Sequence, residues 1–283
     1  MRKVVIVVIV INFIVSILIL IVNRETEEAI TYFPLDYNIN IEQAFTSLQA
    51  TSMKDKQKIL LNWDIQSKTK YPLYLRQDVS LLFANGYLLA ANNTWQTDTN
   101  IIKQHKTFTL GHNKLLQSIS FHHGEIHEHS TIKSTQKMTY DQLYILCCQD
   151  HSTIMTFKYP KSPMEEKTAQ LFDEQIKEKL QTNWQKLMDN YNINERDYFL
   201  IPLIELVKYN DEPLPNLSQE KTATTIGQLW EGLYKNYIIP LSKQKPLSHK
   251  NYMPLILLDR HATHLIVIYE INGQSEQLYQ NIS

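Results

Sequence analysis

A histidine-rich segment carries the residues best suited to chemistry in this sequence. Residues 122–129 read His-His-Gly-Glu-Ile-His-Glu-His. In an extended strand, residues two apart point to the same face. The face with the most ligating groups would contain His123, Glu125, His127 and His129. Imidazole nitrogens and carboxylate oxygens are ligands of zinc and iron, so the segment is a candidate metal site.

The spacing within this segment limits the metal hypothesis. Side chains on one face of a strand are about 6.6 to 7 Å apart, so only two neighbours could share one ion, and other ligands would have to come from elsewhere. We therefore favour a polar hairpin that turns near Gly124 and exposes its imidazoles to solvent. The alternatives are a metal site and a pH-responsive role, the latter based on the ordinary histidine pKa of about 6.5.

Other candidates for chemistry are weaker. Asp259, His261 and His264 lie in a predicted turn between two strands, where aspartate is common because it stabilises turns. Cys147 and Cys148 are adjacent, so in a strand their side chains would point to opposite faces, and we expect them to remain unpaired and packed as small apolar residues. The sequence contains no G-x-S-x-G, H-E-x-x-H or Walker motif, and no catalytic residue or organic cofactor can be assigned.

The beginning of the chain predicts a membrane anchor. Residues 4–22 are apolar except for Asn12 and Ser16. As a helix they would span about 29 Å, close to the thickness of the hydrocarbon core of a bilayer. A cleaved signal peptide and a buried soluble helix are the alternatives, but the apolar run is long and no Ala-x-Ala site follows it closely.

Charges on either side of residues 4–22 predict the orientation. Arg2 and Lys3 precede the apolar run, whereas acidic residues dominate after it. Positive flanks remain in the cytoplasm, so the rest of the chain is expected outside it. The predicted organisation is a cytoplasmic stub and anchor at 1–24, a spacer at 25–40 and an extracytoplasmic domain at 41–283. The best candidate for a sub-division lies at 160–163.

Hydrophobic periodicity predicts an α+β domain with a largely antiparallel sheet and two long amphipathic helices. Asn85-Gly86 between apolar runs indicates a tight β-hairpin, and Asn272-Gly273 indicates one more turn before the last strand. The predicted strands are 79–84, 87–91, 101–104, 107–110, 115–122, 142–148, 153–159, 198–207, 255–259, 264–271 and 276–279. The predicted helices are a short one at 41–50 and long ones at 163–191 and 222–237. Ser162 is the expected N-cap of the first long helix, and the aromatic face of the second is expected to pack in the core rather than dock a partner.

Composition excludes some functions. The 283 residues carry a formal net charge of -1, which gives no support to a nucleic-acid partner. We therefore expect a single-pass, membrane-anchored extracytoplasmic protein whose partners are the bilayer, through residues 4–22, and an envelope protein or wall component. The competing hypothesis is an extracytoplasmic metal-dependent hydrolase that uses the histidine segment.

Overall fold

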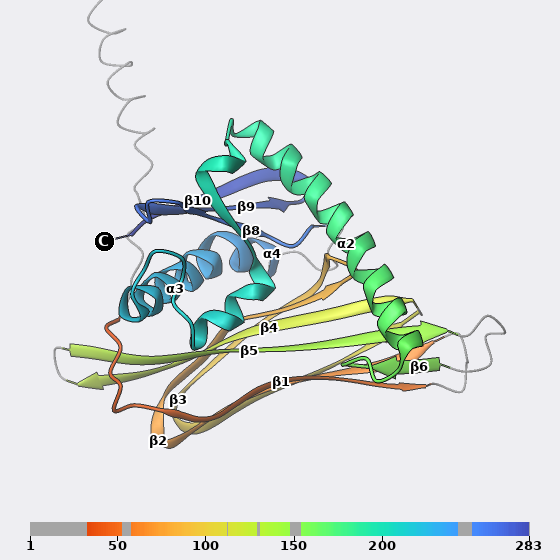
Figure 1. Ribbon diagram of the computed structural model, residues 1–283. Helices are drawn as coiled ribbons and strands as arrows, with labels where there is room; N and C mark the ends of the chain where they lie inside the picture. Colours follow the sequence, from red (N-terminus) through yellow and green to blue (C-terminus); the bar gives the residue numbers. More distant parts are fainter. Residues whose placement is uncertain are drawn as a thin grey trace, which may run out of the picture. The chain divides into compact units, whose positions relative to one another are not determined.

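One very long strand, β2, is the centre of the larger of two sheets in the computed structural model of this chain (Figure 1). The structure describes residues 33–52, 58–111, 113–128, 131–147, 154–242 and 251–282. The strands of the larger sheet are β1 Ile41–Ser52, β2 Ile59–Ala84, β3 Tyr87–Leu110, β4 Lys114–Glu128, β5 Thr131–Cys147 and β6 Ile154–Phe157. All ladders between named strands are antiparallel, so the predicted α+β class with mostly antiparallel pairing is confirmed.

Strand β2 changes partners along its length. Its first part pairs with β1 and with the end of β3, and its second part pairs with the start of β3 and with β4. Pairing with β3 is interrupted between Lys68 and Leu73, where Pro72 has no N–H to donate to a ladder. The strand bends there. We use the name corner for this irregular segment of β2, residues 69–73, together with residues 97–101 of β3.

The bend brings β1 against β4 and β5, to which it is not paired. Thr46 Oγ1 on β1 donates to Ser120 Oγ on β4 at 2.8 Å, and the Leu48 N–H donates to Asp141 Oδ2 on β5 at 2.7 Å. Between the two parts of this curled sheet lies an apolar cluster that includes Leu48, Trp63 and Leu82. The curled sheet therefore has an interior of its own.

Strand β1 replaces the helix that the sequence predicted at 41–50. The apolar positions resemble a helical stripe because the pairing of β1 with β2 shifts register between Ile41 and Gln43. Ile41 is buried before this shift, and Thr46 and Leu48 are buried after it, so the buried positions change from odd to even numbers. The irregularity hides the period of two that would identify a strand.

Two tight turns have the predicted backbone conformation. Asn85 and Gly86 have φ angles of 51° and 81°, and Asn272 and Gly273 have 56° and 78°. The first turn joins β2 to β3, so the predicted hairpin is confirmed, although its strands are much longer than expected. The predicted strands at 87–91, 101–104 and 107–110 are one continuous strand, β3.

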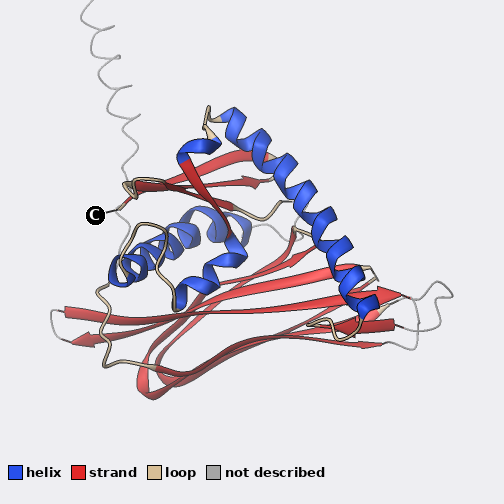
Figure 2. Ribbon diagram, viewed as in Figure 1, coloured by secondary structure: helices blue, strands red, loops and turns tan. Residues whose placement is uncertain are grey.

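Helices and a second sheet cover the outer face of the curled sheet (Figures 1 and 2). The two predicted long helices are confirmed. The first is α2 Pro163–Asn190, with Ser162 as its N-cap, and the second is α3 Gln219–Leu233, which continues into a π-helix, Tyr234–Ile238, and the short α4 Ile239–Ser242. The 3₁₀ segments are Glu195–Asp197 and Leu203–Asn210. The second sheet has the order β10-β9-β8-β7, with β7 Tyr198–Pro202, β8 Leu255–Asp259, β9 His264–Ile271 and β10 Gln274–Asn281.

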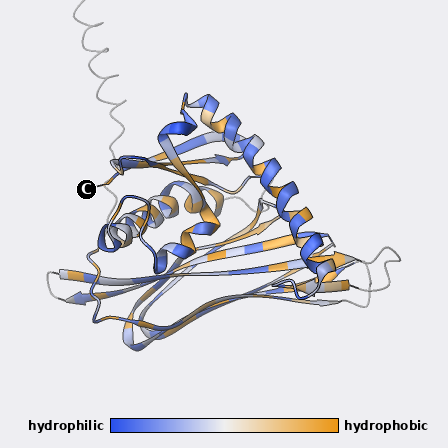
Figure 3. Ribbon diagram, in the orientation of Figure 1, coloured by the Kyte–Doolittle hydropathy of each residue, from blue (hydrophilic) through white to orange (hydrophobic). Residues whose placement is uncertain are grey.

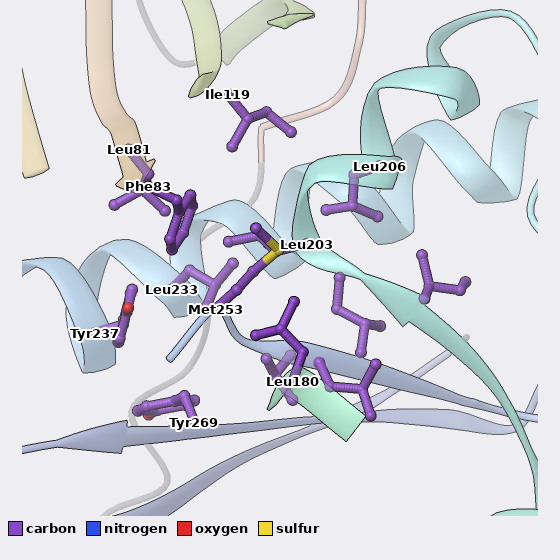
Figure 4. Packing of buried hydrophobic residues seen from close by; sticks show 14 of the residues in the cluster. Leu81, Phe83, Ile119, Leu180, Leu203, Leu206, Leu233, Tyr237, Met253 and Tyr269 are labelled. Carbon is purple, nitrogen blue, oxygen red and sulfur yellow. The ribbon is translucent and has the colours of Figure 1, made fainter. Parts of the chain in front are cut away.

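A large apolar core joins the helices to both sheets. Figure 4 shows Leu81, Phe83 and Ile119 of the curled sheet near Leu206, Leu233 and Met253. The aromatic face of α3 is buried here, since Trp230 and Tyr237 are at most 1% exposed, and the predicted packing is confirmed. Helix α2 contributes one apolar stripe, whereas most of its remaining surface is hydrophilic (Figure 3).

Some sequence predictions concern residues that the structure does not describe. The residues outside the described part include the predicted anchor at 4–22, Cys148 and His129. Among the helices in the described part of the chain, none is both long and apolar enough to cross a membrane.

Candidate functional site

The histidine segment is the end of a continuous strand and contains no hairpin. Strand β4 pairs with β5 without interruption from Lys114 to Glu128. Gly124 lies within this ladder, and a Cβ added to it would lie 3.2 Å from Leu73 Cδ1 and from Thr135 Cγ2. The glycine therefore permits close packing rather than a turn. The favoured interpretation, a hairpin with solvated imidazoles, is wrong for this part of the chain.

His122 faces the interior of the curled sheet and is completely buried. Its Nδ1 lies 2.7 Å from Ser67 Oγ, and its Nε2 lies 2.7 Å from Thr139 Oγ1. These contacts belong to a chain of hydrogen bonds across five strands. In order, its members are Gln104, Gln77, Ser67, His122, Thr139, Thr46 and Ser120.

The direction of this chain fixes the tautomer of His122. Thr46 gives its only hydroxyl proton to Ser120, so Thr139 must donate to Thr46. Thr139 then accepts from an N–H at His122 Nε2, and His122 Nδ1 accepts from Ser67. Burial, followed by the charge of Lys137, lowers the pKa of His122 to about 3. His122 is therefore a neutral link in a buried network, and it is not a free ligand.

Glu125 lies on the opposite face of β4 and connects three cationic or basic side chains. Its Oε1 accepts a hydrogen bond from Arg76 Nη1 at 2.8 Å, and its Oε2 lies 2.7 Å from His127 Nε2. His123 Nε2 is 3.2 Å from Oε1, an ion-pair distance without hydrogen-bond alignment. Arg76 also reaches Glu231 of α3 at 3.4 Å, so this cluster ties the strand to the helix.

The charge on Glu125 is strongly stabilised. Burial by itself would raise the pKa of this carboxyl group, but the interactions with His123, Arg76 and His127 outweigh burial and lower the pKa to about 2. Three of the four predicted metal ligands, His123, Glu125 and His127, are thus brought together by the strand. Within the described residues, no group of three or more His, Cys, Asp or Glu side chains has an arrangement that could hold a metal ion.

Glu125 and His127 also line a pocket of about 790 Å³, which we call the corner pocket. Its walls come from residues 38–40 and 42, residues 69–74, residues 97–98 and residues 125–127. The ring of His127 packs against Tyr74 at a centroid distance of 5.4 Å, and Trp95 stacks against the same tyrosine at 5.7 Å. The pocket therefore combines polar side chains with the rings of Tyr71, Tyr74 and His127, and Trp95 lies next to it against Tyr74.

Backbone irregularity forms the corner pocket. Two neighbouring strands are irregular at positions that lie opposite each other. Strand β2 bends at Pro72, and Asp98 on β3 has a positive φ of 50°. Aspartate tolerates a positive φ better than most residues. Irregularities of this kind in a strand redirect the side chains next to them. The remaining wall is held by Asp36, whose N–H bonds to the Ser134 carbonyl on β5 and whose carboxylate accepts from Asn38.

Comparisons with known proteins do not extend this description. No family model, no curated protein and no solved structure matches the chain.

The second candidate, at Asp259, forms a turn. Asp259 Oδ2 accepts from the N–H groups of His261 and Thr263 and from Thr263 Oγ1. Burial opposes ionisation, but these hydrogen bonds from the turn outweigh it and lower the pKa of Asp259. His264 lies next to the turn and contacts Tyr198 and Tyr279. The predicted structural role of this aspartate is confirmed.

Sequence reasoning did not identify several residues of the site. Arg76 lies 49 positions before Glu125, and Tyr74 lies 53 positions before His127. Asp98 belongs to a polar stretch without periodicity. The one local signal was Tyr71-Pro72 within an otherwise extended segment, which marks an irregular strand.

Proposed function

We propose that this chain is a single-pass membrane-anchored protein whose extracytoplasmic domain binds an envelope protein or wall component at the corner pocket. The anchor at residues 4–22 and the acidic residues after it support the location. The observation that carries the binding role is the corner pocket itself, a concave site of about 790 Å³ with aromatic and polar walls, among them the charged Glu125 carboxylate that Arg76 holds in place. Ligand sites commonly have this combination.

The arrangement around Glu125 favours binding over the hydrolase hypothesis. A metal ligand needs a carboxylate oxygen that can face the ion, but Oε1 accepts from Arg76 and Oε2 lies against His127. The guanidinium would also repel a divalent cation at this position. Zinc or iron bound in stoichiometric amount by the purified full-length chain, and lost in a His123→Ala, His127→Ala variant, would instead support the hydrolase.

Binding to isolated cell envelopes tests the proposal. The detergent-solubilised full-length chain should sediment with envelope material, and Tyr71→Ala combined with Trp95→Ala should abolish this. Both side chains are more than half exposed, so their removal should leave the fold intact. Tyr159→Ala is a matched control, because Tyr159 is 70% exposed and does not line the corner pocket. Equal sedimentation of all three proteins would contradict the proposal.

Protease treatment tests the location separately. Protease added to intact cells whose outer surface is accessible should digest the domain. Complete protection until the cells are lysed would contradict an extracytoplasmic domain.

A further inference from the structure

Aromatic side chains at the corner and next to it present exposed ring surface beside the pocket. Tyr71 is 64% exposed and Trp95 is 57% exposed, although large aromatic side chains are usually buried. Tyr71 lines the corner pocket, as does Tyr74, whose ring stacks with Trp95 at an interplanar angle of 29°. Exposed aromatic rings offer broad apolar faces to a ligand at a small entropic cost, because each has only two side-chain torsions.

The polar walls of the pocket supply uncharged hydrogen-bonding groups. Asn38 and Asn40 provide amides, which both donate and accept, and Thr97 provides a hydroxyl group. All three are exposed. They could therefore satisfy a ligand that carries many neutral hydroxyl groups.

The charged residues of the pocket oppose an anionic ligand. Two acidic residues, Glu42 and Asp98, line the exposed part of the wall, whereas the lining includes one lysine, Lys70. The Lys70 ammonium group lies 5.1 Å from the centre of the Tyr71 ring. Glu125 adds a further carboxylate, which is already balanced by Arg76. Like charges would thus disfavour phosphate-rich or carboxylate-rich ligands.

From these contacts we propose that the corner pocket binds a neutral glycan chain. The C–H faces of its pyranose rings would pack on Tyr71, Tyr74 and Trp95, and its hydroxyl groups would bond to the asparagines, Thr97 and Asp98. This inference rests on the proposed function and specifies the wall component as a carbohydrate. A basic peptide is the competing ligand, since the same carboxylates would attract it.

Tryptophan fluorescence provides a direct test on the full-length chain in a detergent without a sugar headgroup. Trp95 is exposed, whereas Trp63, Trp184 and Trp230 are each at most 8% exposed. Chitohexaose or cellohexaose should shift the emission to shorter wavelength and protect Trp95 from acrylamide quenching. Trp95→Phe should remove the optical signal while calorimetric titration still detects binding, because a second aromatic face remains.

Variants separate specific binding from a general effect. Tyr71→Ala should weaken oligosaccharide binding by at least about tenfold, since it removes one stacking face. Tyr159→Ala should bind as the wild type does. Failure of both oligosaccharides to bind at millimolar concentration, or equal binding by Tyr71→Ala, would overturn the glycan proposal.

Other results distinguish the two proposals. Binding of hexalysine but not of either oligosaccharide would overturn the glycan assignment. If envelope sedimentation still depended on Tyr71 and Trp95, the proposed binding function would stand although the glycan assignment had failed. If sedimentation did not depend on them, both proposals would fail.

Discussion

The two faces of β4 place neighbouring histidines in opposite environments. His122 points into the curled sheet, is completely buried and is hydrogen-bonded at both ring nitrogens. His127 is five positions further along, has a side chain that is 52% exposed and lines the corner pocket. The same residue type is therefore structural on one face of the strand and, near the end of the strand on the other face, available to a ligand.

The largest expected effect is the loss of His122. His122→Ala would leave Ser67 and Thr139 without their shared partner and would create a cavity between five strands, so we expect a loss of about 3 kcal/mol in the free energy of unfolding. Denaturant unfolding followed by fluorescence measures this. A loss below about 0.5 kcal/mol, the usual size for exposed sites, would show that the network is not stabilising.

The Glu125 cluster should be the next most sensitive. Glu125→Gln keeps the shape of the side chain but removes the charge facing Arg76, whose side chain is only 17% exposed. We expect a loss of about 2 kcal/mol, because Arg76 would lose the charge at its 2.8 Å contact and its ion pair with Glu231 is longer, at 3.4 Å. Glu42→Gln, at an exposed site in the same pocket, is the control and should change stability little. Equal stability of both variants would contradict the importance of the buried ion pair.

Acid should destabilise the protein first through His122. Its pKa is about 6.5 in the unfolded chain and is lowered to about 3 in the folded protein, so below pH of about 6.5 the unfolded state binds more protons. Stability should therefore fall with decreasing pH from there towards about 3, with a slope of up to about 1.4 kcal/mol per pH unit from this residue.

Glu125 should contribute only at lower pH. Its pKa is lowered from 4.5 to about 2, so its stabilising effect is complete above about 4.5 and is lost as the pH falls towards 2. Between pH of about 6 and 5, a His122→Leu variant should thus have a shallower pH dependence than the wild type, whereas Glu125→Gln should keep the wild-type slope. Identical slopes for wild type and His122→Leu would show that His122 is not a buried neutral group.

Local chemistry allowed part of this fold to be predicted. Asn85-Gly86 and Asn272-Gly273 specify tight turns by themselves, and Ser162 with Pro163 specifies the start of α2. Strands β8 and β9 were predicted with their observed bounds, since they are short apolar runs beside clear turns. These elements depend on residues close together in the sequence.

Elements that depend on distant pairing were not predicted. The 26 residues of β2 contact three other strands, and the bend at Pro72 is visible only as a gap in the pairing with β3. For the site, the shared face of Glu125 and His127 followed from strand geometry, but the partner Arg76 did not. The burial of His122 was also missed, because both faces of β4 are covered and alternation alone cannot show which polar residues are inside.

The smallest expected change in stability is at His127, where function should change instead. His127→Ala removes a half-exposed ring whose contacts are Glu125 and Tyr74. Glu125 would keep Arg76, and water could reach the vacated oxygen from the corner pocket, so we expect a loss of no more than about 0.5 kcal/mol. The same variant should weaken ligand binding at the pocket, because the Tyr74 ring loses the neighbour that packs against it. Unfolding and calorimetric titration on one preparation would measure both properties. A large loss of stability with unchanged binding would mean that His127, like His122, is structural, and that the two faces of β4 do not differ in the way proposed.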